Sequence, residues 1–158
     1  MATNNYSNSI AEFSEEFNVP EKELKTFVNN MFPFACKEKS EEQKQKDLDN
    51  ALSRALLVMG VRPHLSGYDY IVHAVKLCLA DGSFSTSITT ALYPAVAKAT
   101  NTTAQRVERA IRHSLNCAKR AGNLYKINSL LQAQVVAPGA SITNGEFIAL
   151  VVCYLRSL

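Results

Sequence analysis

The sequence lacks the long apolar segments of membrane and secreted proteins. No apolar run approaches the roughly 18 residues that a membrane-spanning helix needs, so we expect no membrane partner. The first residues are polar and do not contain the basic segment and following apolar segment of a secretory signal. These absences favour a location in the cytoplasm.

Closely spaced cysteines are also absent. Cys36, Cys78, Cys117 and Cys153 are separated by 42, 39 and 36 residues. No Cys-x-x-Cys pair occurs, and no His stands near a Cys at the usual spacing of zinc ligands. Three of the four lie within apolar helical patterns, which is typical of small buried hydrophobic residues in a reducing compartment. We therefore expect no metal site and no cofactor.

Acidic residues are scarce after residue 50. Residues 51–158 contain only Asp69, Asp81, Glu108 and Glu146 against eleven Lys and Arg, a balance of +7. None of these acids is paired, and no nucleophile motif or glycine-rich phosphate loop occurs, so we predict no enzyme activity. Residues 1–50 have the opposite balance of −4, with ten acids against six Lys. This asymmetry predicts two parts with different partners.

The hydrophobic pattern predicts an all-α fold. Apolar residues recur at helical spacing in six segments, 48–59, 68–79, 88–99, 103–120, 127–133 and 147–155. Pro94 lies inside the third segment, so we expect a break near Leu92 and Tyr93. Thr143 and Glu146 fit a capping box that begins the last helix. Only residues 134–137 resemble a strand.

Residues 1–46 are predicted to form an acidic helical segment and linker, ahead of a folded domain over residues 47–158. Ile10, Phe13 and Phe17 have helical spacing, and Pro20 is well placed to open a second helix. The charged run 40–47 is either a solvated linker or the exposed start of a longer helix. Because the exposed positions are acidic and would repel phosphate, we expect this segment to pack or to bind a protein partner.

The predicted helix 103–120 has one apolar and one polar side. At 100° per residue, the apolar arc contains Val107, Ile111, Ser114, Leu115 and Ala118. The opposite arc, here called the polar arc, contains Gln105, Arg106, Glu108, Arg109, Arg112, His113, Asn116, Lys119 and Arg120. Arg and Gln can read guanine and adenine edges, and Glu can accept a hydrogen bond from cytosine. This distribution is typical of the recognition helix of a helix-turn-helix protein.

Charge alone does not decide what the polar arc does, because a cationic helix face is usually just solvated. Asn101, Thr102 and Thr103 form a polar turn with good N-cap residues between this helix and the helix predicted before it. These two features favour DNA contact only together with the family resemblance described below. Glu108 has two interpretations: it reads a base, or it pairs with Arg112 one turn further along the helix.

The order of several short segments carries a resemblance to a known family. The segments are 60–68, 87–94, 101–103, 106–113, 122–123 and 143–149. From about Leu48 to Arg156 the chain resembles the C-terminal effector domain of the stage-zero sporulation response regulator, a master sporulation transcription factor. The resemblance implies a six-helix domain that contains a helix-turn-helix and binds short DNA boxes, often with a second copy in tandem.

The resemblance also implies which residues meet DNA. Arg106, Glu108 and Arg109 match the base-contacting positions residue by residue. Arg112 and His113 match positions near the backbone or groove edge, and we group with them Gln105, Asn116, Thr102 and Thr103. The family's phosphoacceptor receiver of about one hundred and twenty residues does not fit into the first fifty residues here, so we expect no control by phosphorylation.

Two classes of function follow. In the first, the chain is a sequence-specific regulator that binds double-stranded DNA without a receiver. In the second, it is a protein-interaction or competitor module that acts on a full-length sporulation regulator through its acidic N-terminal helices.

Overall fold

The computed structural model describes residues 20, 22–24, 26 and 40–158. Contacts divide the chain into two units, Met1–Lys44 and Gln45–Leu158. The described residues do not include the expected helical pattern of Ile10, Phe13 and Phe17. They also leave out Cys36 and most of the second N-terminal helix. Within the second expected helix, Glu23 and Leu24 donate main-chain hydrogen bonds to the Pro20 oxygen, at 2.8 and 3.2 Å.

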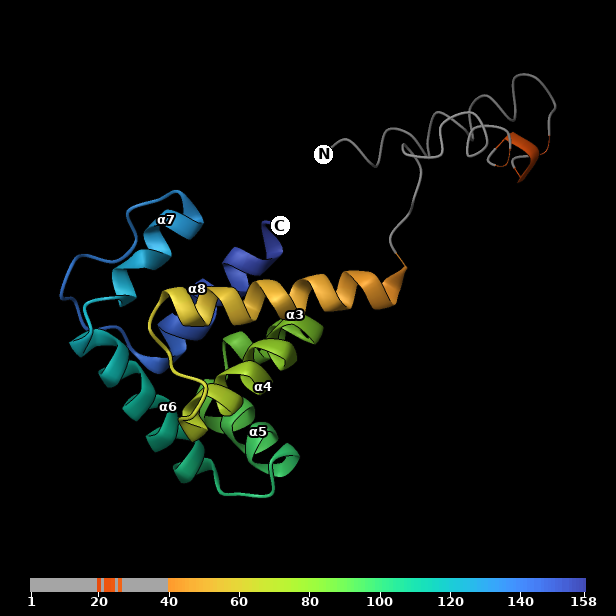
Figure 1. Cartoon of the computed structure of the whole chain (residues 1–158). Coiled ribbons are helices and arrows are strands. Elements are labelled where there is room, and N and C mark those ends of the chain that lie inside the picture. The colour runs from red at the N-terminus through yellow and green to blue at the C-terminus, as the bar shows by residue number, and fades with distance from the viewer. Residues whose placement is uncertain (1–19, 21, 25, 27–39) are drawn as a thin grey trace. The chain divides into compact units, whose positions relative to one another are not determined.

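All regular secondary structure in residues 40–158 is helical. Six α-helices follow one another, α3 Glu41–Val58, α4 Ser66–Ala80, α5 Tyr93–Ala99, α6 Ala104–Arg120, α7 Ile127–Leu131 and α8 Asn144–Arg156 (Figure 1). Short 3-10 turns cover Gly82–Ser85 and Leu124–Lys126, and a π-helical turn covers Ile88–Leu92. No strand occurs among the described residues, so the all-α prediction is confirmed, and none of their helices is long and apolar enough to cross a membrane.

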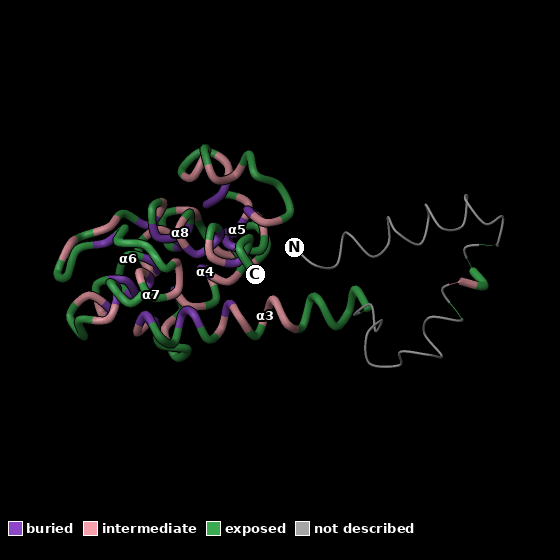
Figure 2. Tube along the Cα trace, turned by 90° about the horizontal axis from the view of Figure 1, so that it is seen from above, coloured by how far each residue is buried: buried purple, intermediate pink, exposed green. Residues whose placement is uncertain are grey.

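The core forms where α4 packs against α5, α6 and α8. Ile71 of α4, Ile111 of α6 and Phe147 of α8 are almost completely buried, and the C-terminal half of α3 adds Leu52 and Leu56 (Figure 2). Each such side chain contributes about 1.5–3 kcal/mol when it leaves water. The domain therefore supplies a rigid support for the helices at its surface.

The charged run 40–47 is the exposed start of a longer helix, which was one of the two alternatives. The Ser40 hydroxyl accepts a hydrogen bond from the Gln43 amide at 3.2 Å and caps the first turn of α3. The helix ends before Gly60, whose φ of +80° is a left-handed conformation that favours glycine.

Pro94 breaks the third predicted helix at the expected place. Residues 88–92 form a π-helical turn, and α5 begins at Tyr93 with the proline in its first turn. Proline has no main-chain N–H. It is tolerated there because the N–H groups in the first turn of a helix have no acceptor within the helix, so none is lost. The Tyr93 amide bonds instead to the oxygen of Ile88, five residues earlier.

Residues 134–137 do not form the strand that their pattern resembled. The Asn128 side chain accepts from the amides of Val135 and Val136 at 3.0 and 2.9 Å and donates to the Val136 oxygen at 2.7 Å. One side chain thus satisfies the backbone groups that a neighbouring strand would have bonded. The preceding helix, α7, ends at Leu131 because Gln132 adopts a left-handed φ of +52°.

Candidate nucleic-acid interface

The turn between α5 and α6 completes a helix-turn-helix. Asn101 adopts a left-handed φ of +52°, which asparagine tolerates better than most residues. Thr103 is the N-cap, and its hydroxyl accepts a hydrogen bond from the Arg106 amide at 3.3 Å. The turn of residues 100–103 joins the two helices at one end of the domain (Figure 1) and fixes where α6 begins.

The two arcs of α6 separate as the periodicity predicted. The buried residues of α6 are Val107, Ile111, Ser114, Leu115 and Ala118. The exposed members of the polar arc are Gln105, Arg106, Arg109, Arg112, His113, Asn116 and Arg120. Glu108 and Lys119 are half-buried at its margins. The structure therefore brings the predicted base-contacting and edge-contacting side chains of α6 onto one surface, directly after the turn that carries Thr102 and Thr103.

α4 holds α6 at very short range. A Cβ atom on Gly67 would lie 2.2 Å from the Ala110 oxygen and 2.3 Å from Ser114 Oγ, so only glycine fits between the two helices. Ser114 Oγ is buried, and it has no hydrogen-bond partner among the described residues. This contact places the backbone of α6 directly against α4.

α8 also fixes α6, through a residue that the sequence analysis did not single out. The buried Asn144 donates from Nδ2 to Tyr93 Oη and to the Glu108 oxygen, both at 3.1 Å. Burial raises the pKa of Tyr93, so its hydroxyl stays protonated near neutral pH. In the sequence, Asn144 is marked only by its position directly after Thr143. The capping box predicted for Thr143 and Glu146 is confirmed.

Some charged side chains of the polar arc have partners within the domain, and others do not. Glu108 forms an ion pair with Arg112 on the next turn of the helix, the second interpretation of its role. Lys119 donates a hydrogen bond to Ser141 Oγ in the loop before α8. Within residues 40–158, Arg106 and Arg109 form no ion pair, so their guanidinium groups are available to a polyanion.

The structure corrects the inference that three cysteines are buried, because Cys78 is buried but Cys117 is only half-buried. Cys153 is exposed instead of buried, because α8 turns Val151, Val152 and Leu155 inward. His113 and Cys117, four residues apart on α6, bring Nε2 and Sγ to 3.7 Å. A separation of four residues on a predicted helix is sufficient to place these two side chains next to each other from the sequence alone.

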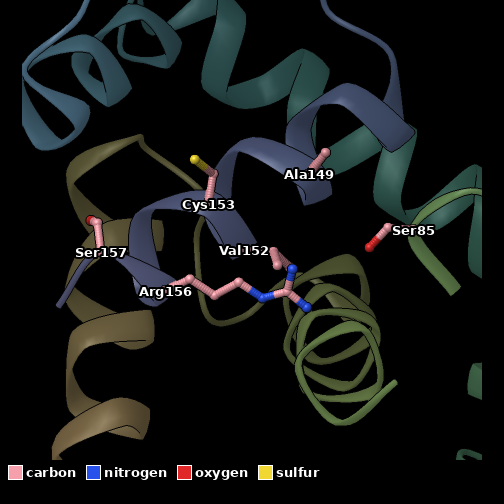
Figure 3. Close-up of a pocket in the computed structure, with 6 residues that line it drawn as sticks. All are labelled: Ser85, Ala149, Val152, Cys153, Arg156 and Ser157. Atoms are coloured by element: carbon pink, nitrogen blue, oxygen red, sulfur yellow. The ribbon is translucent and has the colours of Figure 1, made fainter. Parts of the chain in front are cut away.

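A shallow pocket of about 380 Å³ lies over α8, away from the polar arc. Its lining residues are Ser85, Ala149, Val152, Cys153, Arg156 and Ser157, none of which belongs to α6 (Figure 3). Arg156 stretches its guanidinium group toward Val152 and donates from Nη2 to the Cys78 oxygen at 3.0 Å. This cation is therefore engaged within the domain.

A comparison with known families gives the class of the domain. The family described as "Sporulation initiation factor Spo0A C terminal" matches residues 52–155, from within α3 to the end of α8. The chain belongs to this family. The resemblance inferred from the short segments is thus confirmed, and the family is one of DNA-binding transcription factor domains, not of enzymes. Residues 52–155 form the DNA-binding effector domain of a sporulation regulator.

Proposed function

We propose that the chain is a sequence-specific regulator of transcription that inserts α6 into the major groove of duplex DNA. The carrying observation is that α6 follows a helix-turn-helix turn with its apolar arc fully buried and with seven of the nine residues of its polar arc exposed. The major groove is about 12 Å wide and admits one α-helix. In this proposal the first fifty residues do not act as a phosphoacceptor receiver, and the protein works in the cytoplasm.

The first two turns of α6 are proposed to read bases, because recognition helices present their N-terminal residues to base edges. Arg106 and Arg109 are exposed there and can each bond a guanine bidentately, while Glu108 can accept from cytosine. Gln105, Arg112, His113 and Asn116, together with Thr102 and Thr103 in the turn, are proposed to contact the backbone or groove edge. A second copy on an adjacent box is part of the same proposal.

The test is selection of bound fragments from random duplexes, followed by affinity measurements on the selected box. We expect Arg106→Ala and Arg109→Ala to weaken binding by about 1–3 kcal/mol and to relax preference at one position each. Arg54→Ala on α3 removes the same charge from an exposed position outside α6 and serves as the control. Equal affinity for selected and scrambled duplexes at about 0.15 M salt contradicts sequence-specific reading.

The acidic balance of residues 1–50 supports a second role, binding of a protein partner or competition with a full-length sporulation regulator. Removal of residues 1–39 leaves Ser40 and its cap on α3 in place. We expect this truncation to keep DNA binding and to lose a protein contact, measured by co-purification with a full-length regulator. An unchanged protein contact after truncation contradicts the role of this segment.

A further inference from the structure

We propose that His113 and Cys117 form a two-ligand site for a thiophilic metal ion such as Zn²⁺ on the surface of α6. Sγ of Cys117 and Nε2 of His113 are 3.7 Å apart. Zinc binds sulfur at about 2.3 Å and imidazole nitrogen at about 2.0–2.1 Å, so two ligands of a tetrahedral ion stand about 3.6 Å apart. The two atoms therefore already have the separation that one ion requires.

The chemistry of the two side chains also suits such an ion. Cys117 binds as the thiolate and releases its proton to solvent, and His113 binds as the neutral imidazole through the Nε2 lone pair. Thiolate and imidazole together select zinc and related soft ions over magnesium or calcium. His113 is exposed and Cys117 half-buried, so an ion reaches them directly from solvent.

The pair is an incomplete cage. Among the described residues no group of three or more His, Cys, Asp or Glu side chains could hold a metal. Two positions of a tetrahedral ion therefore stay open for water or for a ligand from another molecule. An open site of this kind exchanges its ion readily, as a regulatory site must.

The surroundings couple the metal site to DNA, a step that rests on the proposed function. Arg109 lies one turn before His113, and Arg120 lies one turn after Cys117, so repulsion between cations opposes the ion in the free protein. DNA phosphates at this surface remove that penalty, and the ion with its thiolate adds one net positive charge beside them. Because coupling is reciprocal, metal raises DNA affinity by the same factor by which DNA raises metal affinity.

The metal site is tested on the full, reduced chain without DNA, using Co²⁺ as the probe and Zn²⁺ as the competitor. We expect a thiolate-to-cobalt charge-transfer band that Cys117→Ser abolishes and that His113→Ala weakens at least about tenfold in affinity. The exposed residues Cys153 and His73 provide matched controls, and Cys153→Ser and His73→Ala should leave the band unchanged. A band that persists in Cys117→Ser, or full affinity in His113→Ala, overturns the proposal.

Two further measurements distinguish loss of the metal site from loss of folding, and metal binding from DNA binding. Circular dichroism reports the helix content of each variant, and Cys117→Ala replaces Cys117→Ser if the latter loses helix. Titration of the selected duplex with and without Zn²⁺ should show tighter binding with the ion for the parent chain and no change for Cys117→Ser. A parent chain whose DNA affinity ignores Zn²⁺ overturns the coupling, whereas a chain that binds no duplex overturns the proposed function and leaves the cobalt result standing.

Discussion

The side-chain amide of Asn144 in α8 donates a hydrogen bond to the main-chain oxygen of Glu108 in α6 at 3.1 Å. The same amide donates to the Tyr93 hydroxyl in α5. One buried residue thus ties both helices of the helix-turn-helix to the last helix of the domain.

Replacement of Asn144 by Ala should destabilise the domain by about 1–3 kcal/mol, because the buried Tyr93 hydroxyl loses a partner. The free energy of unfolding in urea gives the magnitude. Asn50→Ala, at an exposed position in α3, should cost far less. A cost for Asn144→Ala no larger than for Asn50→Ala would show that this bond does not hold the helices together.

Gly67→Ala should be among the most damaging single-methyl substitutions in the domain. The added Cβ would stand 2.2 Å from the Ala110 oxygen, which is main chain and cannot turn aside. Overpacking of this kind costs about 1–3 kcal/mol or more. Gly82→Ala is the matched control, since its Cβ would meet only an Arg156 nitrogen at 3.7 Å. Thermal unfolding of the two variants distinguishes them, and equal midpoints would contradict the close approach of α4 and α6.

Glu108→Gln separates the two roles of this residue. The ion pair joins an exposed Arg112 to a half-buried Glu108 on neighbouring turns of one helix and contributes only about 0.2–0.5 kcal/mol, so folding stability should hardly change. If Glu108 reads a base, the selected DNA box changes at one position. If it only pairs with Arg112, the variant binds all duplexes more tightly, because Arg112 is released to the phosphates.

The capping box of α8 should make stability depend on pH in the acidic range. Hydrogen bonds from the Thr143 amide and hydroxyl, at 2.7 and 2.8 Å, lower the pKa of Glu146 below its ordinary value of 4.5. A carboxylate with a lowered folded-state pKa contributes its full stability above the ordinary pKa and loses it as the pH falls through the folded value.

The corresponding variant is Glu146→Gln, which keeps an acceptor but does not titrate. Its unfolding free energy should fall less than that of the parent chain between neutral pH and about pH 3. Glu42→Gln in the first turn of α3 removes a comparable charge as the control. Parallel pH profiles for parent and Glu146→Gln would show that the box carries no acid-sensitive stability.

Local periodicity was sufficient to predict most of the fold. The burial of Val107, Ile111 and Leu115 follows from helix geometry alone, since 3.6 residues per turn place them on one side. The break at Pro94 and the cap at Thr143 follow from backbone chemistry that adjacent residues decide. The polar arc was predictable for the same reason, because it is the remainder of the same helix.

Features that depend on partners distant in sequence were not predictable in this way. Residues 134–137 resemble a short strand, yet the Asn128 side chain bonds the backbone groups of Val135 and Val136. The role of Asn144 depends on Tyr93, 51 residues earlier. Gly67 carried no special signal, because its importance lies in the approach of Ala110 from another helix.

The buried arc and the polar arc of α6 have no residue in common. In the proposed mode of binding, mutations that alter which DNA is bound therefore fall on side chains outside the core, while mutations that change how the helix is seated fall on Gly67, Ser114 and their neighbours. Target preference can thus drift, or be redesigned, one exposed side chain at a time at little cost in folding. Under the same proposal, a duplicated copy of such a domain is free to acquire new promoters while its architecture stays constant.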